Sequence, residues 1–224
     1  MKICAEKLTK DYFRKAGEAN HFYAVREAEL TLEPGSVTVV MGRSGSGKST
    51  LLHMLSGLLV PTQGRITADG EDLYAMPDRA LALFRNRHFG VIPQGHTAVS
   101  TLSVRENVLL PALLGGREEE YREQAEKRLE QFAIAPLADE LPRTLSGGEL
   151  KRIAVARALL TDPEVIFADE PTGDLDDENC SLVLSALRAE ADRGAAVLLV
   201  THEDEAERIA DRVLRMNAGI LETK

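Results

Sequence analysis

The chain has 224 residues, of which 44% are apolar and 28% charged, and its formal net charge is −9. This length fits one large domain, or one domain with a small insert. The negative charge argues against a protein that coats nucleic acid, because phosphate backbones repel an acidic surface.

The start of the chain indicates neither a secretory signal nor a membrane anchor. Residues 1–10 run directly into charged positions, and no apolar run in the sequence approaches the roughly 20 residues that span a bilayer. Cys4 and Cys180 lie far apart in the sequence and outside any metal-binding spacing. We therefore expect reduced thiols in an intracellular protein, with no direct membrane insertion.

The first third of the chain predicts short strands. Segments 3–9, 25–32 and 64–70 are partly alternating, and in the second of them Glu27 and Glu29 alternate with apolar residues. Alternation of this kind is typical of strands with one buried and one solvated face. We expect an antiparallel flank beside a main sheet.

The strongest local motif follows the apolar run 36–41. Residues 42–49, GRSGSGKS, fit the pattern G-x-x-x-x-G-K-[ST] and stand between a predicted strand and a predicted helix over 48–59. In such a loop, backbone N–H groups surround a phosphate, Lys48 reaches the β- and γ-phosphates, and Ser49 offers a hydroxyl to Mg²⁺. A Gly/Ser turn without a ligand is the alternative. The predicted nucleotide contacts are Gly42, Arg43, Ser44, Gly45, Ser46, Gly47, Lys48, Ser49 and Thr50.

Residues 78–87 and 103–133 are predicted to be mostly helical. Ser103 and Glu106 have the spacing of a capping box, and residues 118–132 form a charged amphipathic pattern that we interpret as a solvated helix face. We expect a single domain over residues 1–224. Its core would consist of residues 1–94 and 146–224, and a helical subdomain would span about 95–145.

A second Gly/Ser turn, LSGGE, occupies residues 145–149 and lacks a lysine. Ser146 and Glu149 have the spacing of a capping box ahead of a helix predicted over 149–160. A helix N-terminus behind such a turn also suits a phosphate. These residues alone leave both interpretations open.

Two further apolar runs end in chemically active residues. Run 165–168 is followed by Asp169 and Glu170, and run 195–200 by Thr201 and His202. Continuous apolar runs suit central parallel strands, and ligands gather beyond the C-terminal ends of such strands. We therefore expect the phosphate loop and these side chains to share one site.

The expected roles follow from residue chemistry. Asp169 would hold Mg²⁺, Glu170 would orient or deprotonate water, and His202 would contact the γ-phosphate. Taken singly, the Asp-Glu pair is also compatible with a helix cap, and the histidine with an ordinary strand-end residue.

With the phosphate loop, the stretch 145–176, LSGGELKRIAVARALLTDPEVIFADEPTGDLD, resembles the nucleotide-binding subunit of an ATP-binding cassette (ABC) transporter. The resemblance covers essentially the whole chain. It implies an α/β fold: a P-loop NTPase core with a mostly parallel central sheet, an antiparallel β flank and a helical subdomain.

The resemblance also implies roles for single residues. Glu170 resembles the catalytic glutamate, His202 the switch histidine, and Gln94 a glutamine that contacts Mg²⁺ and faces a transmembrane partner. Tyr12 is the best match for an aromatic residue that stacks on adenine, with Phe13 and Tyr23 as rivals.

In this family two copies pack head to tail around two ATP molecules. The signature of one copy, here Ser146, Gly147 and Gly148, grips the γ-phosphate held by the lysine loop of the other. Asp174, in GDLD, resembles a residue of the loop that crosses the dimer interface. Each ATP thus meets one lysine, which accounts for the second turn without one.

The resemblance implies an ATPase that uses ATP and Mg²⁺ as an ATP-dependent homodimer and drives a separate transmembrane permease subunit, with no nucleic-acid partner. Its place would be the cytoplasmic side of a bacterial cell membrane, peripheral on the inner face through that permease.

Residues 84–94 and 106–114 resemble the subgroup that serves lipoprotein release, macrolide or antimicrobial-peptide efflux, and cell division. Two departures are Ile92-Pro93, where an aromatic residue is expected, and Asp174, where asparagine is common.

Two other functions are disfavoured. An ABC-type ATPase acting on DNA would need long heptad-patterned segments, which the sequence does not show between Gly47 and Arg143; ribosomal members usually carry two cassettes. A regulator with weak turnover would not need Lys48, Asp169, Glu170 and His202 together.

Overall fold

The structure, a computed structural model, describes residues 1–13, 21–95, 97–173 and 175–223. Its strands are β1 (Ile3–Phe13), β2 (His21–Leu32), β3 (Val37–Met41), β4 (Gln63–Ala68), β5 (Glu71–Asp72), β6 (Phe89–Ile92), β7 (Val165–Asp169), β8 (Ala196–Thr201), β9 (Arg212–Asn217) and β10 (Ile220–Thr223). Its α-helices are α1 (Lys48–Leu55), α2 (Asp78–His88), α3 (Val104–Leu114), α4 (Glu118–Gln131), α5 (Gly147–Ala158) and α6 (Asp177–Asp192). Short 3-10 helices are η1 (Leu73–Ala75), η2 (Ala135–Leu137), η3 (Pro142–Thr144) and η4 (Asp204–Ile209).

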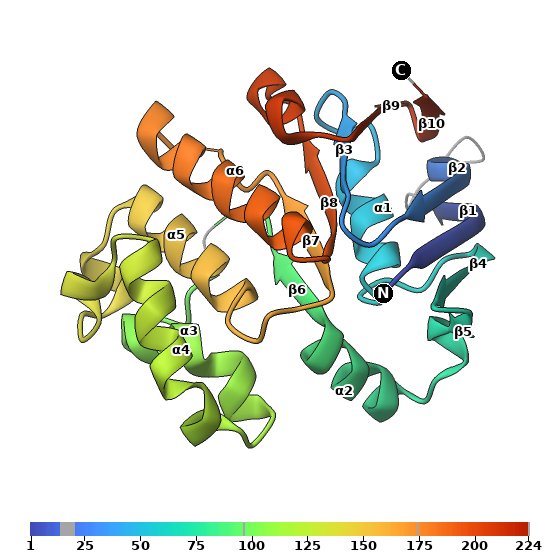
Figure 1. The fold of residues 1–224 in the computed structure, drawn as a ribbon. Helices are drawn as coiled ribbons and strands as arrows, with labels where there is room; N and C mark the ends of the chain where they lie inside the picture. Colours follow the sequence, from blue (N-terminus) through green and yellow to red (C-terminus); the bar gives the residue numbers. More distant parts are fainter. Residues whose placement is uncertain (14–20, 96, 174, 224) are drawn as a thin grey trace.

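A six-stranded sheet of order β10-β9-β3-β8-β7-β6 forms the centre, and its pairs are parallel except β10-β9. Helices α3 to α6 lie on one side of it, and α1 with the second sheet lies on the other (Figure 1). Alternate residues of each central strand enter different cores: Val197 and Leu199 pack toward α5 and α6, and Leu198 packs toward α1. Because both faces are covered, the central strands are continuously apolar, as predicted.

The second sheet is antiparallel, with order β2-β1-β4-β5, which confirms the expected flank. In β2 the side chains of Ala28, Leu30 and Leu32 are buried, while Glu27 and Glu29 are exposed. β1 and β2 both extend beyond the predicted segments, to Phe13 and from His21. This hairpin extension carries the aromatic residues discussed below.

Helix α1 is shorter than predicted, ending at Leu55 instead of residue 59. Gly57 adopts a left-handed φ of 70°, and the Ser56 N–H donates to Leu52 O at 2.9 Å. A left-handed glycine just after the last turn is a common helix stop. The apolar pattern continues past this stop, which explains the overlong prediction.

Helices α3 and α4 pack together and against α5, with Phe132 fully buried among them. The Ser103–Glu106 capping box of α3 is present, as predicted. On α4, Arg122 and Lys127 are exposed, whereas Arg128 is buried. The expectation of a solvated face therefore holds for only one side of this helix.

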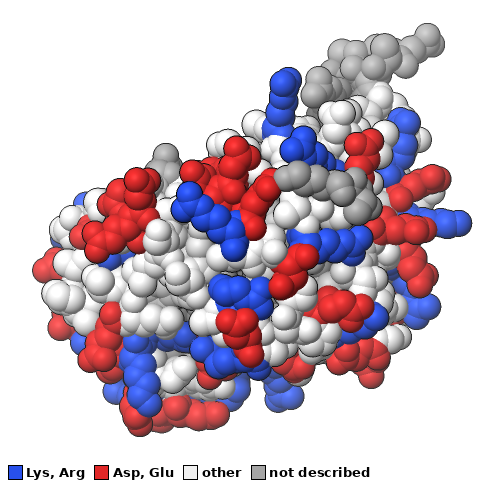
Figure 2. Space-filling model, turned by 45° about the horizontal axis from the view of Figure 1, so that its top comes forward, with Lys and Arg blue, Asp and Glu red and all other residues white. Residues whose placement is uncertain are grey.

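Surface charge is mixed. Figure 2 shows described Lys and Arg side chains alternating with Asp and Glu over one face of the molecule.

Among the described helices, none has the length and apolar content needed to cross a bilayer.

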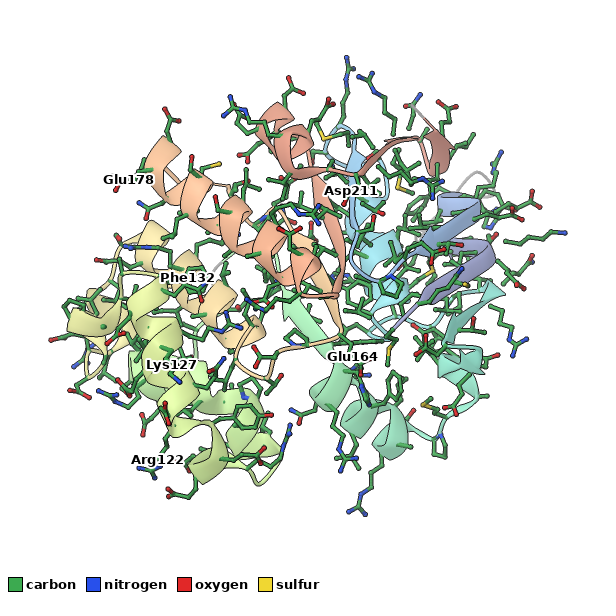
Figure 3. All side chains as sticks on the ribbon, in the orientation of Figure 1. Arg122, Lys127, Phe132, Glu164, Glu178 and Asp211 are labelled. Atoms are coloured by element: carbon green, nitrogen blue, oxygen red, sulfur yellow. The ribbon has the colours of Figure 1, made fainter. Side chains whose placement is uncertain are left out.

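Asp211 fixes the start of the central strand β3 (Figure 3). It accepts a hydrogen bond from the Val37 N–H at 2.8 Å and pairs with Arg188 of α6 at 2.6 Å. These bonds lower the pKa of the Asp211 carboxyl below its usual value, with the Val37 N–H as the largest cause. One carboxylate thus joins β3 to α6.

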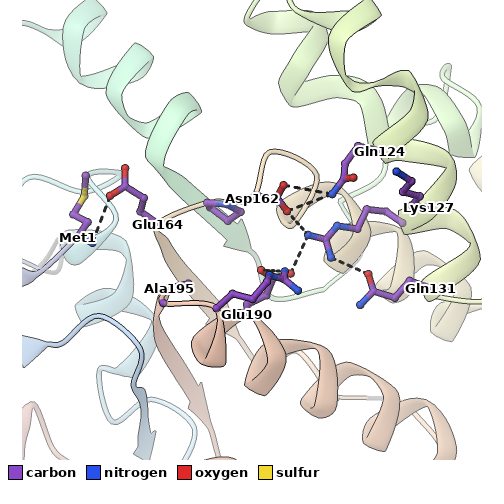
Figure 4. A pocket seen from close by; sticks show the side chains of 12 residues that line it. Met1, Gln124, Lys127, Gln131, Asp162, Glu164, Glu190 and Ala195 are labelled. Carbon is purple, nitrogen blue, oxygen red and sulfur yellow. Dashed lines mark hydrogen bonds and ion pairs between the residues drawn. The ribbon is translucent and has the colours of Figure 1, made fainter.

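A cavity of about 600 Å³ lies between α4, α6 and the loop before β7 (Figure 4). Arg128 of α4 pairs there with Asp162 at 2.7 Å and with Glu190 of α6 at 2.9 Å. Arg128 is 4% exposed and Glu190 is 2% exposed. A buried ion pair therefore joins the α3–α4 region to the core.

Candidate nucleotide site

The C-terminal ends of β3, β7 and β8 lie side by side. β8 pairs with both of the others, and its register sets Thr201 opposite Met41 and Val200 opposite Asp169. The loop that follows β3 and the polar residues that end β7 and β8 therefore meet at one edge of the sheet, as predicted from the three apolar runs.

The phosphate loop requires glycine at two close approaches. A Cβ on Gly47, whose φ is 108°, would lie 2.1 Å from Ala24 O, and one on Gly42 would lie 2.4 Å from Met216 O. Gly47 caps α1 without any side-chain hydrogen bond. The first N–H groups of α1 are thus left to face an anion.

Lys48 stands at the inner side of this loop with 6% exposure. Its Nζ donates to Gly42 O at 2.6 Å and to Arg43 O at 3.2 Å, and lies 3.8 Å from Glu170 Oε1. A buried ammonium needs such partners. The positive charge of Lys48 is therefore held inside the phosphate loop, against the carbonyl groups of its first two residues.

Glu170 has an unusual backbone and a fully engaged carboxylate. Its φ is 48°, a left-handed value that costs roughly 1–3 kcal/mol in a non-glycine residue and persists only where neighbours enforce it. Its carboxylate accepts from Thr201 Oγ1 at 2.9 Å and from His202 Nδ1 at 2.9 and 3.0 Å. Strain of this kind clusters at functional sites.

The hydrogen bond to Glu170 raises the pKa of His202 above its usual value. The His202 side chain is 65% exposed, so the ring is open to solvent. Thr201 is fully buried, and sequence analysis did not assign it a role. The one feature of the sequence that could have pointed to a role for Thr201 is its position next to His202, at the end of a predicted buried strand.

Asp169 has the environment of a cation ligand. It is 1% exposed, and burial raises the pKa of its carboxyl, while a hydrogen bond with Ser49 opposes that rise. Its Oδ1 is buried without a hydrogen-bond partner among the described residues. A hard cation such as Mg²⁺, which prefers oxygen ligands, fits this orphaned atom and the Ser49 hydroxyl beside it.

The described part of the chain contains no cluster of three or more His, Cys, Asp or Glu side chains able to hold a metal. A cation at Asp169 would therefore draw its other ligands from hydroxyl, amide or phosphate oxygens.

A cavity of about 600 Å³ lies over the phosphate loop. Its lining comprises Tyr12, Phe22, Tyr23, Ala24, Ser44, Gly45, Gly47, Lys48, Ser49, Thr50, Gln94, Glu170, His202, Ala218 and Gly219. Gly42, Arg43 and Ser46 line a neighbouring cavity on the other side of the loop, which His202 also borders. The structure thus brings Gln94 and six of the nine predicted loop residues around one space, and it places the other three beside the neighbouring cavity.

Three aromatic side chains line the cavity. Tyr12 and Phe22 are opposite each other in the β1–β2 register and stack with ring centroids 5.7 Å apart. Tyr23 also lines the cavity, whereas Phe13, 80% exposed, is not among its lining residues. Phe22 was missed because the sequence does not show which residues a hairpin places opposite Tyr12.

The signature residues lie apart from this lining, at the N-terminus of α5. Ser146 forms the predicted capping box: its Oγ accepts from the Glu149 N–H at 3.3 Å, and its N–H donates to Glu149 Oε2 at 2.7 Å. The box does not use the N–H groups of Gly147 and Gly148. Capping and anion binding are therefore compatible at this helix end. Asp174 lies outside the described residues.

Comparisons with known proteins agree on one family. A family model described as "ABC transporter" matches residues 25–173. The macrolide export ATP-binding/permease protein MacB of Chlorobaculum tepidum is 40% identical over 96% of this chain, which spans 32% of that protein. The lipoprotein-releasing system ATP-binding protein LolD of Shewanella frigidimarina is 39% identical over 87% of this chain and 82% of its own length.

A solved structure resembles the whole fold. The ATP-binding cassette MJ0796, a dimer in a post-hydrolysis state bound to ADP and phosphate, has a TM-score of 0.91 and 31% identity. The match covers 99% of this chain and 98% of that one.

Proposed function

This chain belongs to the ABC transporter family, and we propose that it is the ATP-hydrolysing subunit of a transporter, working as a head-to-tail dimer on a separate transmembrane partner. The observation that carries the proposal is the convergence of Lys48, Asp169, Glu170 and His202 at the ends of three neighbouring strands. This is the set of groups that ATP hydrolysis requires: a phosphate-binding cation, a metal ligand, a base and a γ-phosphate contact.

Nucleotide binding is assigned to the phosphate loop. The first N–H groups of α1 and the Lys48 ammonium bind the β- and γ-phosphates, and Tyr12, with Phe22 behind it, offers a ring face to the adenine. Lys48 exchanges its present carbonyl partners, Gly42 and Arg43, for phosphate oxygens. A cation would be held by Asp169, Ser49 and Gln94, and Mg²⁺ there would neutralise phosphate charge.

Hydrolysis is assigned to Glu170. Its carboxylate takes the proton of the attacking water, a role typically worth 10²–10⁴-fold in rate. Thr201 and His202 hold that carboxylate beside the cavity. His202, at the exposed rim, is placed to contact the γ-phosphate.

The signature completes the site of another copy. Gly147 and Gly148 present free helix N–H groups, and Ser146 is exposed at the same end. A helix N-terminus carries about half a positive charge, which favours a bound phosphate. ATP thus links two copies, and loss of the γ-phosphate releases them.

The membrane partner follows from the family. ATP-binding subunits of this kind act on a permease, and we place this chain on the cytoplasmic, inner face of a bacterial cell membrane through it. The names of the MacB and LolD relatives favour an export or lipoprotein-release system. Cargo recognition is assigned to the permease.

The direct test is Glu170→Gln, which removes the base but keeps the shape of the side chain. We expect ATP binding to persist, hydrolysis to fall about 10²–10⁴-fold, and the ATP-bound dimer to accumulate. Phosphate release and analytical ultracentrifugation with Mg-ATP measure the last two.

Lys48→Ala is the matched variant that tests nucleotide binding instead of hydrolysis, and we expect it to lose ATP binding. A Glu170→Gln chain that stays monomeric in saturating Mg-ATP and hydrolyses at the parental rate would contradict the assigned role of Glu170.

A further inference from the structure

Lys151 connects the signature helix to the backbone of Glu170. It lies on α5, five residues after Ser146, and is only 4% exposed. Its Nζ donates a hydrogen bond to the carbonyl oxygen of Glu170 at 2.8 Å. A lysine ammonium is thus directed at the main chain of the proposed base.

This contact acts on a residue whose backbone is strained. Glu170 has a φ of 48°, and its N–H donates to Val200 O of β8 at 2.9 Å. Its carboxylate is held by Thr201, the last residue of that strand, and by His202, which follows it. β8 therefore holds one side of Glu170, and α5, through Lys151, holds the carbonyl on the other.

The carbonyl contact matters because the peptide orientation fixes where the side chain points. A left-handed backbone reverts to a commoner conformation unless its neighbours enforce it. Reversion at Glu170 would turn the carboxylate away from the cavity. An error of about 1 Å in a catalytic group costs on the order of 10²-fold in rate.

We propose that Lys151 is a positioning residue for ATP hydrolysis: by holding the Glu170 carbonyl, it keeps the left-handed backbone that aims the carboxylate at the attacking water. The inference rests on the proposed function, because it assumes that Glu170 is the base. In the proposed dimer, the N-terminus of α5 contacts the nucleotide bound by the other copy. Through Lys151, the same helix supports the base that acts on the nucleotide bound by its own copy.

The test compares variants of neighbouring residues on α5. Lys151→Met keeps an unbranched side chain, one atom shorter, and removes the donor, and Lys151→Arg keeps a cationic donor. The matched control is Arg152→Met, because Arg152 also donates to a carbonyl, Phe132 O at 2.9 Å, but does not contact Glu170. The expected result is a fall in kcat of about 10- to 100-fold for Lys151→Met, with the KM for ATP and the ATP affinity within about threefold of the parent.

Lys151→Arg should recover most of that loss, and Arg152→Met should leave kcat within about twofold. Equal losses in Lys151→Met and Arg152→Met would overturn the proposal, because they would indicate general damage to α5. Thermal unfolding of each variant identifies any that fails to fold, and a misfolded Lys151→Met is replaced by Lys151→Leu, which also lacks a donor.

A double-mutant cycle separates this inference from the proposed function. In a Glu170→Gln background, Lys151→Met should lower the residual rate less than twofold, because both changes act through one carboxylate. A further loss equal to that seen in the parent would overturn the positioning role. If Glu170→Gln itself hydrolyses normally, the proposed function fails; if only Lys151→Met is normal, the inference alone fails.

Discussion

At the scale of single residues, the side chains of the site hold one another in place through an ion pair and hydrogen bonds. Lys48 lies 3.8 Å from Glu170, and the same carboxylate binds Thr201 and His202. For the proposed role as base, the Glu170 carboxylate needs only a water in place of one of these partners.

The pH response of His202 follows from this arrangement. Its pKa is raised first by the hydrogen bond that His202 donates to Glu170 and then by the negative charge of that carboxylate. The stabilisation from this contact is complete below the ordinary histidine pKa of about 6.5 and is lost as pH rises through the higher folded-state pKa. Because the ring is mostly exposed, the contribution is small.

We therefore expect NMR titration of the nucleotide-free protein to give a His202 pKa above about 6.5, and Glu170→Gln to bring it down. Glu203→Gln is the matched control, since Glu203 is a weaker cause of the same shift. A His202 pKa unchanged by Glu170→Gln would show that the contact is absent in solution.

At the scale of elements, a buried ion-pair network joins helices α4 and α6. Arg128 of α4 bridges Asp162 and Glu190, and Glu190 also pairs with Arg193 (Figure 4). A buried ion pair is not necessarily stabilising compared with apolar residues, but its geometry is specific. This network joins α4 to α6 and to the loop that carries Asp162.

Breaking that network at one end should be costly. Arg128→Met leaves Glu190 buried with Arg193 alone, and we expect the free energy of unfolding to fall by about 3 kcal/mol, at the lower end for a broken buried pair. Urea denaturation followed by circular dichroism measures the change.

The double variant Arg128→Met/Glu190→Leu should recover much of this loss, because no unpaired carboxylate stays buried at position 190. Arg122→Met is the control on the exposed side of α4, where ion pairs contribute little. Similar losses in Arg122→Met and Arg128→Met would contradict the structural role.

At the scale of the whole molecule, the two Gly/Ser turns with a proposed phosphate contact lie on different parts of one chain. The lysine loop opens α1, on one side of the central sheet, and the signature opens α5, on the other (Figure 1). The cavity lining includes the first turn and not the second. In a two-fold symmetric dimer, each chain gives one turn to each of two sites.

Complementation tests this division. Lys48→Ala and Ser146→Arg chains should each hydrolyse ATP poorly alone, yet their mixture should regain activity, because a mixed dimer contains one site with both an intact Lys48 and an intact Ser146. Phosphate release by the mixture measures this, in solution and with the permease.

The control mixes Lys48→Ala with a chain that carries both changes; such mixed dimers lack an intact site and should not recover. Activity of the first mixture no greater than the sum of its parts, in both settings, would count against a shared site.

Much of this architecture was predictable because local chemistry determined it. The continuously apolar runs indicated strands covered on both faces, and the structure confirms them as β3, β7 and β8. The spacing of glycines around Lys48 indicated the phosphate loop, since only glycine tolerates the approach at Gly47. The Ser103 and Ser146 caps were likewise readable, because a capping box joins residues three positions apart. The assigned site roles, and the division into core and helical subdomain, remain predictions.

Other features were decided by contacts between residues distant in sequence. The Phe22 ring behind Tyr12 depends on hairpin register, and the burial of Arg128 depends on how α4 meets α6. The Lys151 contact requires α5 and the end of β7 to approach each other. The sequence by itself determined which residues are the candidates for the chemistry, because motif spacing lies along the chain. The tertiary structure decided what aims and supports them, because a hydrogen bond or a buried ion pair depends on separation in space.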